Sequence, residues 1–168
     1  MRKKIFAFLL LSALYAGAQE VPDWENPIVV GINKEPYHAT LTLPSQKADC
    51  KEIISLNGKW RFQWSADPGK RPADFYKNDF NTDTWDTITV PGAWQLQGCG
   101  KPIYSNVNYP FQKDAPRVTS EPPAEYYSYG HRNPTGSYVT TFEVTPDMKD
   151  KCLYLHFEGV KSAMYVWV

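Results

Sequence analysis

The chain has 168 residues, of which 42% are hydrophobic, 15% aromatic and 21% charged, and its formal net charge is zero. This length allows one domain with a hydrophobic core and excludes a sandwich joined to a complete (β/α)8 barrel. The balanced charge, without a basic cluster, argues against nucleic acid and anionic membranes as partners and favours a neutral ligand.

The first eighteen residues have the pattern of a secretory signal peptide. Three basic residues at positions 2–4 precede an apolar run over residues 5–14, and small residues follow at 16–18. The run is short for a membrane-spanning helix, so cleavage is favoured over an uncleaved anchor. Cleavage would leave a mature chain that begins near Gln19 and is exported to the periplasm or the medium. It would remove three basic residues and no acid, which gives a net charge of −3.

An irregular lead-in follows over residues 19–49, with four prolines, scattered aromatic residues and no clean period. This composition predicts an extended segment that lies along another surface. From residue 50 the pattern changes to that of short strands and turns. We therefore expect one β-sandwich domain over residues 50–168.

Alternation of polar and large apolar residues predicts the strands of this domain. Over residues 59–64 the alternation places Trp60, Phe62 and Trp64 on one buried face. A short strand is predicted at residues 87–90, where the following proline stops it. The other strands are expected at residues 136–144, 152–158 and 162–168. Strands joined by turns, with almost no helix, predict an all-β antiparallel sandwich.

A long stretch between the predicted strands, residues 91–135, is rich in proline and glycine and has no sustained period. A loop of this length inside a compact domain is unusual and tends to carry function. Before it, Asp83 and Asp86 flank Trp85. We interpret these two carboxylates as loop or helix-start residues rather than an acid/base pair.

The cysteines and histidines do not have the spacing of a metal site. Cys50, Cys99 and Cys152 are widely separated, without a Cys-x-x-Cys pair. Either one disulfide forms after export or all three thiols stay unpaired, and the sequence leaves both open. The histidines at positions 38, 131 and 156 have no cysteine or acidic partner at ligand spacing. No metal site is therefore expected within this chain.

Seven collinear segments resemble the start of β-galactosidases of glycoside hydrolase family 2. The most specific is residues 102–110, which read PIYSNVNYP. The others are residues 23–27, 33–39, 55–62, 90–98, 133–138 and 157–163. Together they extend over essentially the whole mature chain, in order and at plausible spacing.

The resemblance implies a jelly-roll, galactose-binding-like β-sandwich that forms the first domain of a retaining β-galactosidase, an enzyme that hydrolyses terminal β-D-galactosides. In that family a barrel carries two catalytic glutamates about 5 Å apart. No segment here resembles the barrel, so we assign no catalytic residue to this chain. Any magnesium ligands of the full-length enzyme would lie mostly beyond Val168. The chain ends within an apolar run, so we expect an incomplete domain that is inactive by itself.

The resemblance also implies a substrate contact at Asn106. The family's corresponding asparagine lies on a loop that reaches the active site, where it hydrogen-bonds a galactose hydroxyl. An amide suits this task because it both donates and accepts hydrogen bonds. Neighbouring prolines and tyrosines would stiffen the loop. The alternative is a turn residue that bonds its own backbone.

Two other functions stay open. One is a stand-alone, non-catalytic carbohydrate-binding module, and the other is a different family 2 enzyme such as a β-glucuronidase or a β-mannosidase. The segments at 23–27 and 104–110 favour the galactosidase. The expected partners are a β-galactoside sugar, the remainder of the same enzyme with its barrel, and further subunits of a homo-oligomer, which the lead-in would contact.

Overall fold

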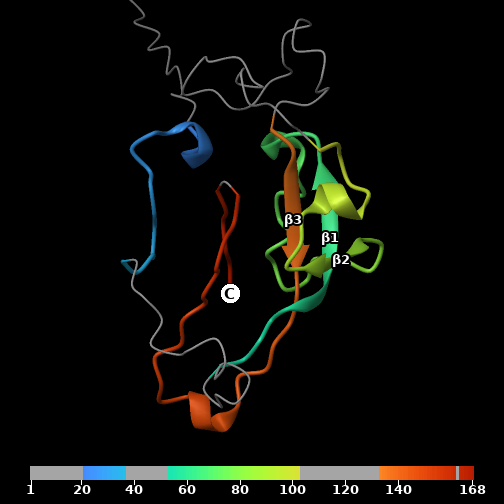
Figure 1. Cartoon of the computed structure of the whole chain (residues 1–168). Helices are drawn as coiled ribbons and strands as arrows, with labels where there is room; N and C mark the ends of the chain where they lie inside the picture. The colour runs from blue at the N-terminus through green and yellow to red at the C-terminus, as the bar shows by residue number, and fades with distance from the viewer. Residues whose placement is uncertain (1–20, 37–52, 103–132, 162) are drawn as a thin grey trace, which may run out of the picture.

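The computed structural model describes residues 21–36, 53–102, 133–161 and 163–168 (Figure 1). Within these ranges the regular elements are three strands and short 3-10 helices, and no helix there is long and apolar enough to cross a membrane. The helices are η1 (Asp23–Glu25), η3 (Pro68–Lys70), η4 (Trp94–Gln97) and η5 (Pro146–Met148). The expected signal peptide at 1–18 and Asn106 lie outside the described residues, as do Cys50, His38 and His131.

The strands form one antiparallel sheet in the order β2-β1-β3. The central strand β1 (Gly58–Ser65) lies between β2 (Asp86–Val90) and β3 (Thr135–Val139), as Figure 1 shows. The sequence alternation explains the strand, since it gives β1 one aromatic face and one polar face. The strand predictions at 59–64 and 87–90 are confirmed, and so is the all-β fold class.

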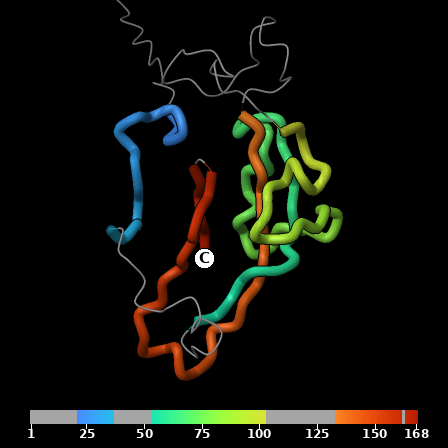
Figure 2. Tube along the Cα trace, viewed as in Figure 1, coloured from blue at the N-terminus to red at the C-terminus, as the bar shows by residue number. Residues whose placement is uncertain are grey.

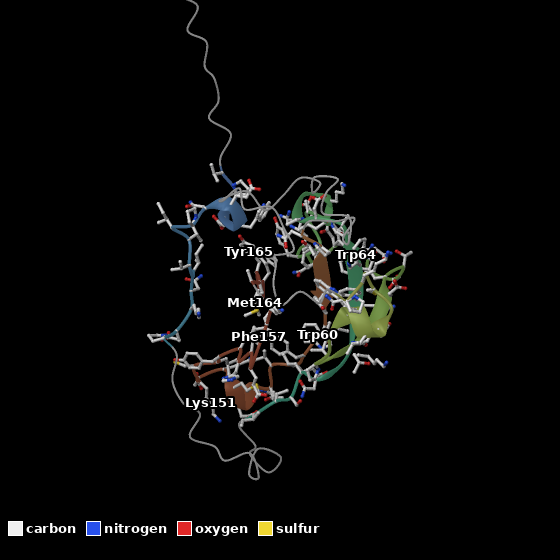
Figure 3. All side chains as sticks on the ribbon, turned by 45° about the horizontal axis from the view of Figure 1, so that its top comes forward. Trp60, Trp64, Lys151, Phe157, Met164 and Tyr165 are labelled. Atoms are coloured by element: carbon white, nitrogen blue, oxygen red, sulfur yellow. The ribbon has the colours of Figure 1, made fainter. Side chains whose placement is uncertain are left out.

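The core lies on the aromatic face of β1. Phe62 is 1% exposed and Ile88 is 2% exposed. Tyr138 pairs with Phe62 in the β1–β3 register, and the two ring centroids lie 4.8 Å apart. Trp60 and Trp64 are half-buried on the same face, so the predicted aromatic face is confirmed with Phe62 at its centre. Figure 3 shows the two tryptophans toward opposite ends of the strand.

A second aromatic cluster fastens the connection between β1 and β2. Trp85 is 8% exposed, and its ring centroid lies 5.8 Å from that of Phe75 and 5.9 Å from that of Phe80. The Trp167 ring approaches Phe75 edge-on at 5.6 Å. The C-terminal segment therefore lies against this connection through an aromatic contact.

The C-terminal half departs from the strand predictions. The strand expected at 136–144 ends at Val139, and the described residues of 152–158 and 162–168 belong to no strand. The physical reason is that alternation defines which side chains share a face, whereas a strand also needs a partner for its backbone groups. In Figure 2 this segment runs between residues 21–36 and the sheet. The edge-on contact of Tyr165 with Trp24, 6.2 Å between centroids, agrees with that position.

Candidate functional site

The described residues on either side of segment 103–132, which carries Asn106, form the candidate site. We call these residues the loop base and define it as Trp64, Gly100, Pro102, Asn133 and Gly136. Gly136 is the register partner of Trp64 across the β1–β3 pair. A Cβ added at Gly100 would lie 3.4 Å from Nε1 of Trp64. The described chain before the segment, at Gly100, and after it, at Gly136, therefore lies near the same tryptophan. Figure 1 shows this region at one end of the sheet.

Two glycines make the turn that leads from η4 into the loop base. Gly98 has φ 92° and Gly100 has φ 71°, a left-handed conformation that glycine adopts without the steric cost of a Cβ. Between them, the Cys99 N–H donates to the carbonyl of Trp94 at 3.1 Å and so closes the end of the helix. On the other side, the Thr135 hydroxyl donates to the Asn133 carbonyl at 3.3 Å.

The helix η4 rests on the aromatic face of the sheet through Trp94. Its ring centroid lies 6.0 Å from that of Phe62. A Cβ added at Gly136 would lie 2.5 Å from Cζ3 of Trp94 and 2.7 Å from Cε2 of Phe62. Real Cβ atoms essentially never approach so closely, so the tryptophan ring occupies the place where any other residue at position 136 would carry its side chain.

At its other end, η4 is bound to the edge of β2 through Gln97. The Gln97 side chain accepts a hydrogen bond from the Thr89 N–H at 2.8 Å and donates one to the Thr89 carbonyl at 3.0 Å. The amide thus satisfies both backbone groups of an edge-strand residue. No periodicity in the sequence indicated this contact, because it joins a loop side chain to the backbone of a strand.

One tyrosine close to the loop base in the sequence, Tyr138, has a shifted pKa. Burial raises the pKa of the Tyr138 phenol, and the neighbouring Cys99 thiol adds to that shift. The five residues of the loop base include no carboxylate, imidazole or amine. These five residues therefore offer no acid/base pair for catalysis.

The other residues singled out from the sequence lie apart from the loop base. Asp83 is a loop residue, as expected, and its N–H donates to Asn81 Oδ1 at 2.7 Å. Asp86 is exposed and begins β2 instead of a helix. Cys99 and Cys152 are both free thiols, so no disulfide joins them. His156 is exposed in the C-terminal segment. Within the described ranges, no three residues of the metal-binding types cluster together.

Comparison with known proteins gives one consistent result. Residues 53–168 match the family described as glycosyl hydrolases family 2, sugar binding domain. The chain is 38% identical over 163 residues to a "Beta-galactosidase" of Priestia megaterium, covering 91% of this chain and 15% of that protein. It is 40% identical over 153 residues to a "Beta-galactosidase" of Clostridium acetobutylicum, covering 87% of this chain and 16% of that protein.

A third relative is a "Beta-galactosidase large subunit" of Lactobacillus acidophilus. It is 40% identical over 120 residues, which is 68% of this chain and 19% of that protein. The chain therefore spans less than a fifth of the length of these curated relatives.

Proposed function

Because this chain belongs to the family 2 glycosyl hydrolases, matching them over their sugar-binding domain, we propose that it is the N-terminal carbohydrate-binding domain of a retaining β-galactosidase. The observation that carries the proposal is the 38% identity to a named β-galactosidase over 91% of the chain. The match covers 91% of the chain and therefore extends well beyond the sheet.

Within that enzyme, we propose that Asn106 contacts the sugar. The loop base supports this role because Gly100, before segment 103–132, and Gly136, after it, both lie at Trp64. Flanking residues that are already positioned lower the entropic cost of presenting a side chain to a ligand. The catalytic glutamates are proposed to lie in the remainder of the enzyme, about 5 Å apart as retention requires.

The test of this proposal is turnover of an aryl β-D-galactoside by the complete protein that contains this chain. We expect hydrolysis with retention of configuration, and no hydrolysis by the 168-residue chain alone. An aryl β-D-glucuronide and an aryl β-D-mannoside serve as the competing substrates. Faster turnover of either competitor would reject the galactosidase, and binding of galactose without turnover by the complete protein would favour the carbohydrate-binding module.

We further propose that the lead-in contacts a second subunit in a homo-oligomer. Ile28, Val30 and Ile32 are 85%, 88% and 67% exposed, in a segment that has a turn at Ile28 and a bend at Ile32. Trp24 anchors the segment, since the Arg71 guanidinium lies 4.7 Å from its ring centroid. The exposed apolar side chains are therefore presented from a fixed point.

Deletion of residues 22–43 from the complete protein is expected to lower its molar mass in light scattering to that of a smaller assembly. The triple variant Ile28→Ser/Val30→Ser/Ile32→Ser should have the same effect. It retains the segment and its Trp24 contact, but it loses the apolar area that the subunit contact would bury. An unchanged mass in both variants would reject the subunit contact.

A further inference from the structure

Among the described residues, the strand β2 forms one edge of the three-stranded sheet, as Figure 1 shows. Its sequence is well suited to pairing with a further strand. Residues 87–90 read TITV, a run of β-branched residues that favours extended chain and carries no charge. An uncharged edge strand of this kind is a template to which another extended chain can add through its backbone.

The register shows which backbone groups of β2 face away from the sheet. Thr89 lies opposite Lys59 in the β1–β2 pair, and both the N–H and the carbonyl of Thr89 bond the Gln97 side chain. Thr89 and Lys59 therefore form a non-hydrogen-bonded pair of the antiparallel ladder, in which the backbone groups face outward. Because this pattern repeats every two residues, the backbone groups of Thr87 also face outward. The outer edge of β2 thus presents two residues, each with a donor and an acceptor.

A side chain occupies the second of these two residues. The Gln97 amide accepts from the Thr89 N–H at 2.8 Å and donates to the Thr89 carbonyl at 3.0 Å, and these are the two bonds that a residue of an added antiparallel strand would make. Gly92 leaves space for the amide, since an added Cβ would lie 2.6 Å from Gln97 Nε2 and 2.9 Å from the Thr89 carbonyl oxygen. We call this pair of bonds the Gln97 contact. An added strand cannot bond Thr89 while the contact is formed.

The Gln97 contact is exposed to solvent, so it contributes little to the stability of the fold. Water can bond the same N–H and carbonyl of Thr89 when the amide is absent. Water does not exclude a strand, however, because it is displaced when the strand adds. Asp86, at the start of β2, and Pro91, directly after its end, act in the same direction as the contact. Charge and proline at an edge strand are means by which sheets avoid edge-to-edge pairing.

We propose that the Gln97 contact closes the β2 edge against a second copy of this chain. An open edge would pair with the same edge of the second copy, antiparallel and about a two-fold axis. This pairing is self-complementary because Thr87 of one copy would lie opposite Thr89 of the other, and each offers an outward donor and acceptor. The contact governs association and not sugar binding, so this role is independent of the proposed function.

The experiment compares Gln97→Ala with Gln95→Ala in the complete protein. Gln95 is a half-buried glutamine in the same helix and makes no side-chain hydrogen bond with the described residues, which makes it the matched control. Light scattering over a concentration series measures the molar mass. We expect the mass of Gln97→Ala to rise with concentration to at least about twice that of wild type, because a two-fold contact joins two copies. Gln95→Ala should keep the wild-type mass, and an unchanged mass in Gln97→Ala would overturn the inference.

Two further variants separate an opened edge from a weakened fold. Ile88→Val trims the buried core of the same strand and leaves the Gln97 contact in place, so it should lower the unfolding temperature and keep the wild-type mass. Gln97→Lys cannot accept from the Thr89 N–H, but it places a charge at the edge that an added strand would bury. It should therefore keep the wild-type mass as well. A mass raised in Ile88→Val, or raised equally by alanine and lysine at position 97, would overturn the inference.

Hydrogen exchange shows whether the association involves β2. In Gln97→Ala, the Thr87 amide should exchange more slowly at the concentrations where the mass has risen than at those where it has not, because its outward N–H then has a strand partner. A raised mass without added protection at Thr87 would place the new contact elsewhere and would reject the inference.

Discussion

Alanine at position 136 is expected to destabilise the sheet by about 3 kcal/mol, which is the upper end of what overpacking of a core costs. The added Cβ would lie 2.5 and 2.8 Å from two carbons of the Trp94 ring and 2.7 Å from the Phe62 ring. Neither ring can retreat cheaply, because Phe62 is buried between β2 and β3 and Trp94 is held within η4. The backbone of β3 must shift instead, and its pairing with Trp64 and Phe62 would weaken.

Hydrogen exchange of the β1 amides in the complete protein measures this effect. The matched control is Gly159→Ala, where nothing lies within 4 Å of the added Cβ and the backbone has no left-handed φ. We expect the control to change stability by less than about 0.5 kcal/mol, as substitutions at open positions do. Equal loss of β1 protection in both variants would show that the Trp94 ring does not occupy the space above position 136.

The elements that could be predicted from the sequence are those with a complete signal in the local sequence. Residues 59–64 alternate without interruption, and the structure has β1 over Gly58–Ser65. The strand at 87–90 was predicted to stop at Pro91, and β2 ends at Val90. Both predictions rest on periodicity and on the missing N–H of proline, which are properties of the local sequence.

The strand predictions that fail are those for which the structure gives the described residues no ladder partner. Residues 152–158 alternate as well as β1 does, but in the structure they belong to no strand. Periodicity gives the face of a strand and not the identity of its neighbour. The same limit explains why β3 stops at Val139, five residues before the end of its alternating run.

The candidate site shows a similar division. The length and composition of residues 91–135 predict a functional loop, and the family resemblance implies a sugar contact at Asn106; both stay predictions. The pair of hydrogen bonds between Gln97 and Thr89 had no such signal in the sequence. A single side chain that bonds a strand edge produces no periodic pattern of residues. Gly136 likewise gave no sign of its role: a glycine within a strand indicates close approach by another group, but the sequence does not name that group.

Asn106→Ala is expected to lower kcat/KM for an aryl β-galactoside roughly 100-fold in the complete protein, since a sugar hydroxyl in a closed site would lose its partner. The reason is an asymmetry of hydrogen bonding. Both the amide and the hydroxyl are satisfied by water before binding, so the bond itself gains little. Removing one partner leaves the other desolvated and unpaired, and the full cost of that desolvation then appears in the transition state.

Asn108→Ala is the matched control, with the same residue type two positions away in the same segment. It should keep kcat/KM within about threefold of wild type, the range of a surface substitution of about 0.5 kcal/mol. Hydrogen exchange of β1 should be unchanged in both variants, whereas Gly136→Ala should lower both the protection of β1 and the activity on every sugar. Equal losses at positions 106 and 108, or a loss at 106 shared equally by galactoside and glucoside, would contradict a specific contact. Either result would instead favour a turn residue at position 106, whose amide serves the backbone of its own loop.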